Sequence, residues 1–432
     1  MELTAKIEIF PTPAQKDTLW KLSERCRLLY NFALKERMDA FKDNVKIGYL
    51  EQQNDLPRIK KRYPQYAWVH SKVLQGTLRH LDTAYRSYNA LKKKGDKAAR
   101  PPRYKGRGEF ATMTYNQSGF KIRDSRITLS QFCNNIALAF EIPKKYVFDK
   151  VLEVSMSSRH GRYFLSVVYQ FREKEYVDNG RYIAIDLGVS NIITSVNTEA
   201  KSLQVRNKRP DTYWEKRIES IQARKSHCRK GSRKYKKLHK HELWMRNKSA
   251  NQIRDFQHKV SDKLVRNTKA NTIIIGDLSP KQMVMKDDAS KYAKGLHRSL
   301  QNTGTIGRFA GFLKYKAKKM GKKVEEISEK DTTKMCSACG KMHGMKLSDR
   351  IMECDCGNHI DRDINSAINI MNGFLSQNAL VAGLSAFALK LRQTGLLNDN
   401  DGSALAEVPY AGGDTAGFAG GEDPPVRVVY KG

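Results

Sequence analysis

Four cysteines in the last third of the chain constrain its fold most tightly. They form two short turns, Cys336-Ser-Ala-Cys339 and Cys354-Asp-Cys356, which are separated by 14 residues and each followed by a glycine. Zn²⁺ prefers four sulfur or nitrogen ligands in a tetrahedron, and two facing cysteine turns supply them. The alternative is four free, buried cysteines, but burial alone would not require this paired spacing. We therefore expect one Zn²⁺. A site closed by four cysteines leaves no position for a substrate, so the ion would be structural.

The charge of the chain limits its partners. The 432 residues include 79 Lys and Arg against 45 Asp and Glu, a formal net charge of +34, which favours a polyanionic partner. The segment 201–250 alone carries 17 basic and four acidic residues. A charge run is often a solvated surface, but this excess would repel itself and indicates a nucleic-acid channel.

Two features argue for a cytoplasmic protein without a membrane partner. The longest mainly apolar stretch, 379–389, is shorter than the roughly 18 residues that suggest a membrane span. The first residues, MELTAKIEIF, lack the basic and then apolar order of a signal peptide. The other three cysteines, Cys26, Cys133 and Cys228, are scattered, so we expect no disulfide framework.

Hydrophobic patterns divide the chain into segments. Alternating residues at 2–9 indicate a strand, and apolar spacings of three and four within 14–96 indicate amphipathic helices. A basic loop follows, and short strands separated by turns fill 111–171, as in a small barrel or sandwich. From about residue 395 an acidic, Gly- and Ala-rich tail is expected to be disordered. Further strands are expected at 182–186, 272–278 and 322–329, and a further helix at about 303–320.

Two acids lie at the ends of predicted elements. Asp186 ends an apolar strand just before Gly188, and Asp363 lies at the start of a helix in DRDINSAINI. Alone, Asp186 could form a turn and Asp363 could cap the helix. Together, in a basic chain, they suggest carboxylates gathered around divalent cations, because two-metal phosphodiester cleavage needs several of them.

Several motifs, in order along the chain, resemble the TnpB family. They are KIEIFPTPAQKDTL, RLLYNFALKER, VLQGTLRHLDTAYRSY followed by PPRYKGR, IAIDLGVSN, IIIGDL, and CSACG…CDCGNHIDRDINSAINI. TnpB proteins are transposon-encoded, RNA-guided DNA nucleases that are similar to type V CRISPR effectors. The resemblance covers about residues 1–373, and the block of cysteines and DRDIN is its most specific part.

The resemblance implies a multidomain α/β protein. A wedge-type β-barrel would carry a helical recognition domain, and a RuvC-like nuclease of RNase H fold would be interrupted by a zinc-ribbon module that binds the target nucleic acid. The corresponding residues are 1–10 and 101–178 for the barrel, 11–100 for the helical domain, 179–331 and 358–394 for the nuclease, 332–357 for the zinc ribbon and 395–432 for the tail.

The resemblance also implies three acids that bind catalytic Mg²⁺. Two map onto Asp186 and onto Asp363, the Asp of a D-x-N motif, with Asp361 as a nearby alternative. The third is usually the Glu of a Glu-Asp-Leu motif, but this chain has Gly276-Asp277-Leu278 at that position. Glycine cannot coordinate a metal, so the third acid must come from elsewhere if the site is active.

Glu329 is the acid that we favour for the third position. Some TnpB relatives similarly have this Gly together with a Glu on the next strand, and an RNase H fold places adjacent strand ends side by side. Asp277 is the second choice, since it lies one position further along its strand and would point to the other face. If Glu329 were only a surface residue, the nuclease would be inactive.

The resemblance therefore implies an RNA-guided DNA endonuclease. A guide RNA from the transposon end would pair with one strand of double-stranded DNA, and the protein would read a short motif beside the target and cut at one Mg²⁺-dependent site. The alternative is a nuclease-inactive, RNA-guided DNA-binding repressor, which Gly276 motivates and the pair Asp186 and Asp363 opposes. The resemblance implies a bacterial or archaeal protein near the nucleoid, and leaves monomer and dimer both open.

Overall fold

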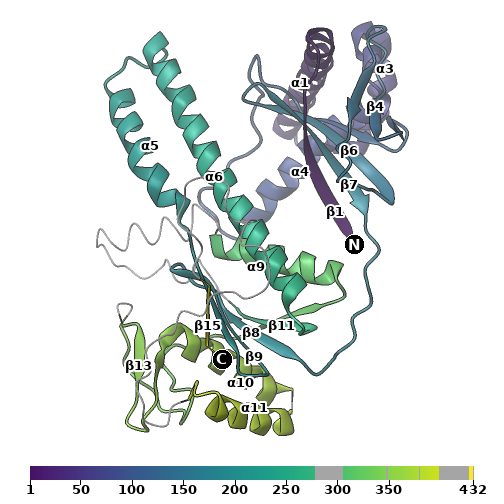
Figure 1. The fold of residues 1–432 in the computed structure, drawn as a ribbon. Coiled ribbons are helices and arrows are strands. Elements are labelled where there is room, and N and C mark those ends of the chain that lie inside the picture. Colours follow the sequence, from purple (N-terminus) through teal and green to yellow (C-terminus); the bar gives the residue numbers. More distant parts are fainter. Residues whose placement is uncertain (278–304, 347–348, 379, 398–427, 432) are drawn as a thin grey trace. The chain divides into compact units, whose positions relative to one another are not determined.

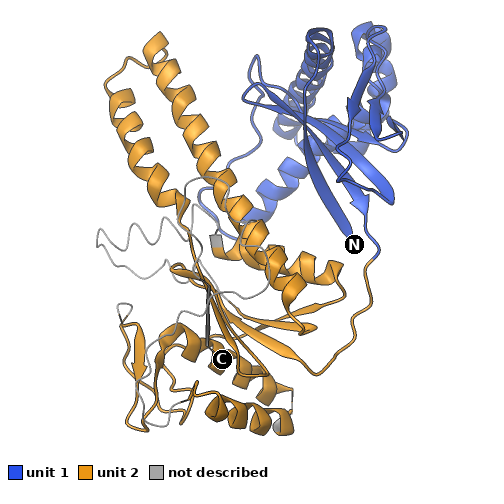
Figure 2. Ribbon diagram, viewed as in Figure 1, with its two compact units in different colours: residues 1–172 blue, residues 173–432 orange. Residues whose placement is uncertain are grey.

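The computed structural model of the protein describes residues 1–277, 305–346, 349–378, 380–397 and 428–431. These residues form two compact units, Met1–Arg172 and Glu173–Gly432 (Figure 2). The division between the units lies close to the boundary expected at 178. The finer division into five domains stays a prediction, and its segments 278–304 and 398–427 lie outside the described residues.

The first unit is built around a four-stranded antiparallel sheet with the order β1-β7-β6-β2 (Figure 1). Its strands are β1 (Glu2–Ile9), β2 (Met113–Asn116), β6 (Lys150–Arg159) and β7 (Arg162–Gln170). The strand predicted from the N-terminal alternation is thus confirmed. A separate three-stranded sheet contains β3 (Phe120–Arg123), β4 (Arg126–Leu129) and β5 (Leu138–Glu141). Closure into a barrel stays a prediction.

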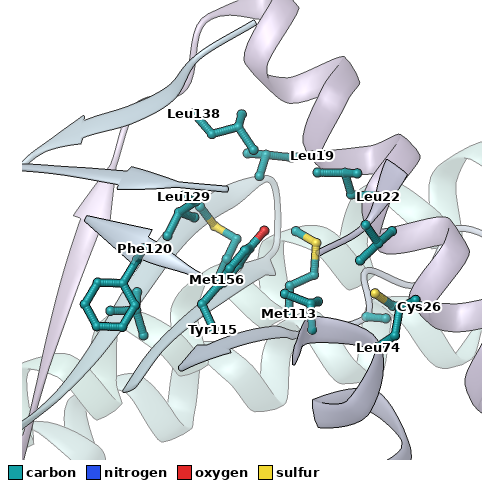
Figure 3. Packing of buried hydrophobic residues seen from close by; sticks show 14 of the residues in the cluster. Leu19, Leu22, Cys26, Leu74, Met113, Tyr115, Phe120, Leu129, Leu138 and Met156 are labelled. Atoms are coloured by element: carbon teal, nitrogen blue, oxygen red, sulfur yellow. The ribbon is translucent and has the colours of Figure 1, made fainter. Parts of the chain in front are cut away.

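The helices of the first unit follow the predicted apolar spacing. They are α1 (Pro13–Lys42), α2 (Tyr49–Asn54), α3 (Leu56–Arg62) and α4 (Ser71–Lys93), with a 3₁₀ turn, η1, at Pro64–Trp68. Thr12 and Gln15 form a capping box that fixes the start of α1. Figure 3 shows Leu19 and Leu22 of α1 in one cluster with Met113 of β2. The unit therefore has its own hydrophobic core.

The second unit contains a six-stranded mixed sheet with the order β12-β11-β8-β9-β10-β15. Its strands are β8 (Tyr182–Asp186), β9 (Asn191–Asn197), β10 (Ser202–Arg206), β11 (Thr272–Gly276), β12 (Lys323–Ile327) and β15 (Val428–Lys431). β8, β11 and β12 run parallel, whereas β8 to β9, β9 to β10 and β10 to β15 are antiparallel pairs. The carboxyl ends of β8, β11 and β12 therefore meet at one edge, beside the start of β9.

Helices cover both faces of this sheet. Ala184 and Ile274 belong to an apolar cluster with α10 (Arg362–Gln377) and α11 (Val381–Gln393). Ile185 and Ile275 belong to another with α6 (Arg233–Asn267) and α9 (Thr305–Lys319). Because successive residues of a strand point to opposite faces, β8 and β11 must be apolar throughout. The residues at their ends are thus held on a rigid, doubly covered sheet.

A long helical hairpin carries most of the basic segment 201–250 (Figure 1). α5 (Pro210–Ser226) packs on the first half of α6 through a small apolar cluster that includes Trp214. Glu242 is buried between the two helices, and its carboxylate pairs with Lys225 of α5 and with Arg246 of α6. Other basic side chains of the hairpin are exposed, among them Lys236, Lys237 and Lys240.

The C-terminal residues differ in part from the expected disorder. Val428–Lys431 forms β15 and pairs with β10, where Tyr430 lies opposite Leu203. The short run Val-Val-Tyr has a high strand propensity and adds to the open edge of the sheet through its main chain. The acidic composition of the preceding residues hides this local signal. Among the described residues, no helix combines the length and the apolar character needed to cross a membrane.

Candidate metal centres

The four cysteines come together as the sequence predicts. Their sulfur atoms all lie within 4.8 Å of one another, with 3.7 Å between Cys336 and Cys356 and 3.5 Å between Cys339 and Cys354. A tetrahedron with Zn–S distances of about 2.3 Å has edges of about 3.8 Å. The four thiols therefore have the spacing that Zn²⁺ requires, and they fill all four positions, which suits a structural ion.

The local backbone explains why the cysteine turns form. Gly340 and Gly357 follow the turns with φ values of 78° and 87°, in the left-handed region where a side chain would be strained. Their N–H groups donate to the carbonyls of Cys336 and Cys354, each at 2.9 Å. Asn358 joins the turns, because its Nδ2 donates to Cys336 Sγ at 3.2 Å and its carbonyl accepts from the Cys354 N–H at 3.0 Å.

The second cysteine turn leads directly into a helix with predicted catalytic residues. It connects β13 (Ile351–Glu353) to β14 (His359–Asp361), and α10 begins at the next residue, Arg362. The zinc module is therefore covalently continuous with the helix that carries Asp363.

The three predicted acids gather at the carboxyl edge of the sheet. Asp186 is the last residue of β8, Glu329 follows β12 by two residues, and Asp363 is the second residue of α10. Burial, together with the negative charges of Asp363 and Glu329, raises the pKa of Asp186 to about 8. Carboxylates that repel one another in a buried site are a typical setting for divalent cations.

Gly276 provides the space that Glu329 fills. A Cβ atom on residue 276 would lie 2.1 Å from Glu329 Oε2 and 2.9 Å from Glu329 Cβ. Both distances are far below van der Waals contact, so the two positions cannot both carry a side chain in this arrangement. Glu329 Oε2 is buried and has no hydrogen-bond partner among the described residues, and burial raises the pKa of Glu329 to about 7, assisted by the charge of Asp277. An unpaired buried carboxylate oxygen fits a cation ligand.

Asp361, and not Asp363, caps α10. Asp361 Oδ1 accepts from the N–H groups of Asp363 at 2.9 Å and Ile364 at 3.1 Å, and from Gln204 Nε2 at 3.0 Å. The alternative that Asp363 is a helix cap is therefore wrong. Asp363 Oδ2 instead accepts a hydrogen bond from Asn191 Nδ2 at 3.1 Å. Asp361 Oδ1 is thus already used by backbone and amide donors, which leaves the prediction with Asp363.

The remaining alternative acid, Asp277, differs from Glu329 in its surroundings. Asp277 is exposed, and its N–H donates to the Ile327 carbonyl at 2.7 Å, which continues the pairing of β11 with β12. Within the part of the chain that the structure describes, the four cysteines are the one group of three or more His, Cys, Asp or Glu residues whose ligand atoms all lie within 4.8 Å of one another. The three acids are thus spaced more widely than the ligands of one small ion.

Sequence reasoning missed several polar residues around the acids. Asn191 contacts Asp363, and the Ser366 side chain lowers the pKa of the neighbouring Asp186. Arg362 Nε lies 3.8 Å from Asp363 Oδ1 and lowers the pKa of Asp186 against the larger effect of burial. One signal in the sequence was the presence of polar residues between the apolar residues of α10. The structure buries three of them, Asn365, Ser366 and Asn369.

Three family models match separate parts of the chain. They are described as a helix-turn-helix domain, matched by 1–46, a "Probable transposase", matched by 166–286, and the Cas12f1-like TNB domain, matched by 307–370. The third match includes all four cysteines of the zinc module as well as Glu329 and Asp363. Residues 1–46 form β1, α1 and the following turn in this structure.

Two curated relatives match most of the chain. A proposed RNA-guided DNA endonuclease of Streptomyces pristinaespiralis is 27% identical over 385 residues, which are 88% of this chain and 91% of the relative. The Escherichia coli protein InsQ, named for the same proposed activity, is 25% identical over 389 residues, or 85% and 90% of the two chains. A TnpB-like protein of Acanthamoeba polyphaga mimivirus is 29% identical over 248 residues, which are 56% and 46%.

A solved structure of Cas12f1 with its sgRNA and target DNA has a TM-score of 0.52 to this chain, with 13% identity over 84% of this chain and 83% of that one. At this identity the likeness concerns the fold alone. The fold and the cysteine site define a Cas12-like, mixed α/β protein with a zinc-ribbon-like module. Together with the family models and relatives, they confirm the predicted resemblance to TnpB proteins.

Proposed function

We propose that the chain is an RNA-guided DNA endonuclease that cleaves double-stranded DNA at one RuvC-like site. The relatives that match most of its length are named for this activity. The RuvC-like assignment is supported by the order of the sheet, in which the antiparallel strands β8, β9 and β10 are joined by the parallel strands β11 and β12. This order brings an acid at the end of β8 next to residues that follow β11 and β12.

Asp186, Glu329 and Asp363 would hold two catalytic Mg²⁺ ions between them, which suits acids that are spaced more widely than the ligands of one ion. When bound, Mg²⁺ supplies charge that neutralises the scissile phosphate and lowers the pKa of a water nucleophile. Asp186 would present its carboxylate from the rigid end of β8. Asn191 would orient Asp363 by donating to one of its two oxygens. Arg362, beside these acids, would limit their mutual repulsion before a cation binds.

One observation carries the proposal of an active site: the Glu329 carboxylate lies where a side chain at position 276 would lie. The acid that the sequence lacks at Gly276 is thus available in nearly the same volume from the next strand. An inactivated site would have no need for a buried, unpaired carboxylate at this point, because such a group costs stability. The arrangement favours the nuclease over the inactive DNA-binding repressor.

The basic surface supports nucleic acid as the partner. The net charge of +34 and the basic hairpin α5–α6 suit the phosphates of a guide RNA and its duplex with target DNA. We propose that the guide derives from the transposon end, as in the TnpB family. Sequence would then be read by base pairing, while the protein reads a short motif beside the target.

The proposal is tested by cleavage of a matched plasmid by the purified protein with its guide RNA and Mg²⁺. Glu329→Gln keeps the shape of the side chain and removes its charge. We expect the cleavage rate to fall about 100-fold or more, since even residues that only hydrogen-bond a metal ligand contribute 10- to 100-fold. Glu326→Gln is the matched control, because Glu326 is exposed on the same segment and pairs with Lys314.

Two results would contradict the proposal. Guide-dependent binding of DNA without any cutting by the native protein would establish the repressor instead. Cleavage by Glu329→Gln at the native rate, together with loss of cleavage in Asp277→Asn, would move the third ligand to Asp277 while leaving the nuclease in place.

A further inference from the structure

α10 has two amide side chains where its pattern requires apolar ones. Asn365 and Asn369 lie four residues apart on one face, and they are only 0% and 3% exposed. Their neighbours Ile364, Ile368 and Ile370 form part of the apolar cluster under the sheet. A buried amide costs free energy unless it is hydrogen-bonded, so these two residues need specific partners.

The partners belong to the segment just before the first cysteine. Asn365 Nδ2 donates to the Thr332 and Met335 carbonyls at 3.3 and 2.8 Å, and Asn369 Nδ2 donates to the same two carbonyls at 2.8 and 2.7 Å. Asn365 Oδ1 accepts from the Ser337 N–H at 2.9 Å. Two side chains of α10 thus hold the backbone on both sides of the zinc ligand Cys336.

The same segment is hydrogen-bonded to the acids. The N–H and hydroxyl groups of Thr332 both donate to the Glu329 carbonyl, at 3.2 and 2.9 Å. The Thr332 hydroxyl oxygen also lies 3.1 Å from Ser366 Oγ, and the Ser366 side chain lowers the pKa of the neighbouring Asp186. The hydrogen bonds therefore run without a break from the zinc module, through α10 and Thr332, to Glu329, and Ser366 lies between Thr332 and Asp186.

We propose that Asn365 and Asn369 are positioning residues that make the zinc module part of the scaffold of the cation site. They fix the segment 332–337 on α10, and Thr332 then fixes the turn that presents Glu329. Glu329 follows a strand end with no secondary structure of its own, so its place depends on these contacts. This inference rests on the proposed function, since it assumes that Glu329 and Asp363 bind a divalent cation.

The test measures binding of Mn²⁺ alone to the zinc-loaded chain without guide RNA, by calorimetry or electron paramagnetic resonance, with Asp186→Asn as the reference that lacks the site. Asn369→Leu keeps the side-chain volume and removes the donor, and we expect about 10-fold weaker Mn²⁺ binding. Thr332→Val is the milder second variant, with an expected weakening of about threefold. Asn378→Leu is the matched control, because Asn378 Nδ2 donates to the Phe374 carbonyl at 2.8 Å at the far end of α10.

A purely structural role would lower the melting temperature of Asn369→Leu and leave its Mn²⁺ affinity unchanged. The absorption of Co²⁺ bound by the four thiolates reports whether the zinc site is intact in each variant. Native affinity in both Asn369→Leu and Thr332→Val, or in Thr332→Val alone if the other does not fold, would overturn the inference while leaving the nuclease proposal untouched. If the variants bind Mn²⁺ more weakly but the native protein never cuts DNA, the inference would stand and the nuclease proposal would be overturned. Absence of Mn²⁺ binding by the native chain would defeat both.

Discussion

Position 276 and the side chain of Glu329 share one volume. The short distance from a Cβ at 276 to Glu329 Oε2, 2.1 Å, cannot be relieved without moving the carboxylate. Glycine at 276 is thus a requirement of the acid on the neighbouring strand, and not only the loss of an acid. The residue at position 276 and the acid at position 329 therefore depend on each other sterically.

This pairing predicts the effect of the smallest change at position 276. Gly276→Ala should displace Glu329 and lower guide-dependent cleavage about 10- to 100-fold, since small misplacements of metal ligands have effects of this size. Cleavage of a matched plasmid under single-turnover conditions measures it. The double variant Gly276→Glu with Glu329→Gly moves the acid to the usual position of the family and should recover much of the activity. Full activity of Gly276→Ala would show that Glu329 is not a ligand.

The raised pKa values predict how the cation-free protein responds to pH. Burial raises the pKa of Asp186 to about 8 and that of Glu329 to about 7, with neighbouring acids adding to both shifts. Both values lie above the roughly 4 of an unfolded acid, so between about pH 4 and 8 these two carboxyl groups hold more protons in the folded chain than in the unfolded one. Their contribution to stability should therefore fall as the pH rises through this window.

The measurement is the melting temperature of the zinc-loaded protein from pH 5 to 9, with and without added Mg²⁺. Without Mg²⁺ the melting temperature should decrease with pH, and Mg²⁺ should raise it more at pH 8 than at pH 6, because the cation binds the ionised acids. Asp186→Asn removes the larger shift and should flatten the profile. A native profile that is as flat as that of Asp186→Asn would argue against a buried, mutually repelling cluster.

The acids themselves could be predicted from the sequence, but their partners could not. Asp186 and Asp363 stand out because each lies at the end of a predicted element, and Glu329 because Gly276 leaves a gap in the motif. The contact of Asn191 with Asp363 joins residues 172 positions apart. It depends on the order of strands in the sheet, which local patterns do not encode.

At the scale of elements, we expect the hairpin of β13 and β14 to depend on a metal held by the four cysteines. β13 and β14 have three residues each, and a two-stranded hairpin of this length is not stable in water by itself. A metal held by the four thiolates would join it to the first cysteine turn, next to the isolated bridge between Met335 and Met342. Metal–sulfur bonds would therefore add to the packing of Met352 and Ile360 against the apolar cluster of α10.

Removal of zinc should loosen this module selectively. In the Cys339→Ser variant, amide hydrogens of β13 and β14 should exchange about 100-fold faster, while those of β8 and β11 stay protected in the covered sheet. Cys228→Ser is the control, since Cys228 lies on the helical hairpin away from the cluster. The native protein should contain one zinc per chain by metal analysis. A folded native chain without zinc, or unchanged exchange in Cys339→Ser, would refute the assignment.

Elements were predictable wherever a local pattern decides their type. The apolar run of β11 and the spacing within α9 are examples, and the structure has a strand and a helix there. β15 is a counterexample, because its strand character depends on the open edge of β10, far earlier in the chain. Composition alone suggested disorder for the residues around it.

At the scale of the whole molecule, the net charge of +34 does not act as one field. Several exposed lysines are neutralised locally by an acid one helical turn away, as in Lys21 with Asp17 at 2.7 Å and Lys35 with Asp39 at 2.8 Å. On the first half of α6, Lys236, Lys237 and Lys240 are exposed, and the buried Glu242 nearby already pairs with Lys225 and Arg246. We therefore expect a large share of the phosphate contacts on this hairpin.

The dependence of guide RNA binding on salt tests this distribution of charge. Each phosphate contact contributes about 0.7 to 0.9 to the slope of log K against log salt concentration. A triple variant, Lys236→Gln, Lys237→Gln and Lys240→Gln, should reduce the slope by about 2. The control triple replaces Lys21, Lys35 and Lys390, which lie outside the hairpin and each pair with an acid, and should change the slope little for the same loss of charge. Equal slopes for both triples would mean that binding follows the total charge and not the hairpin.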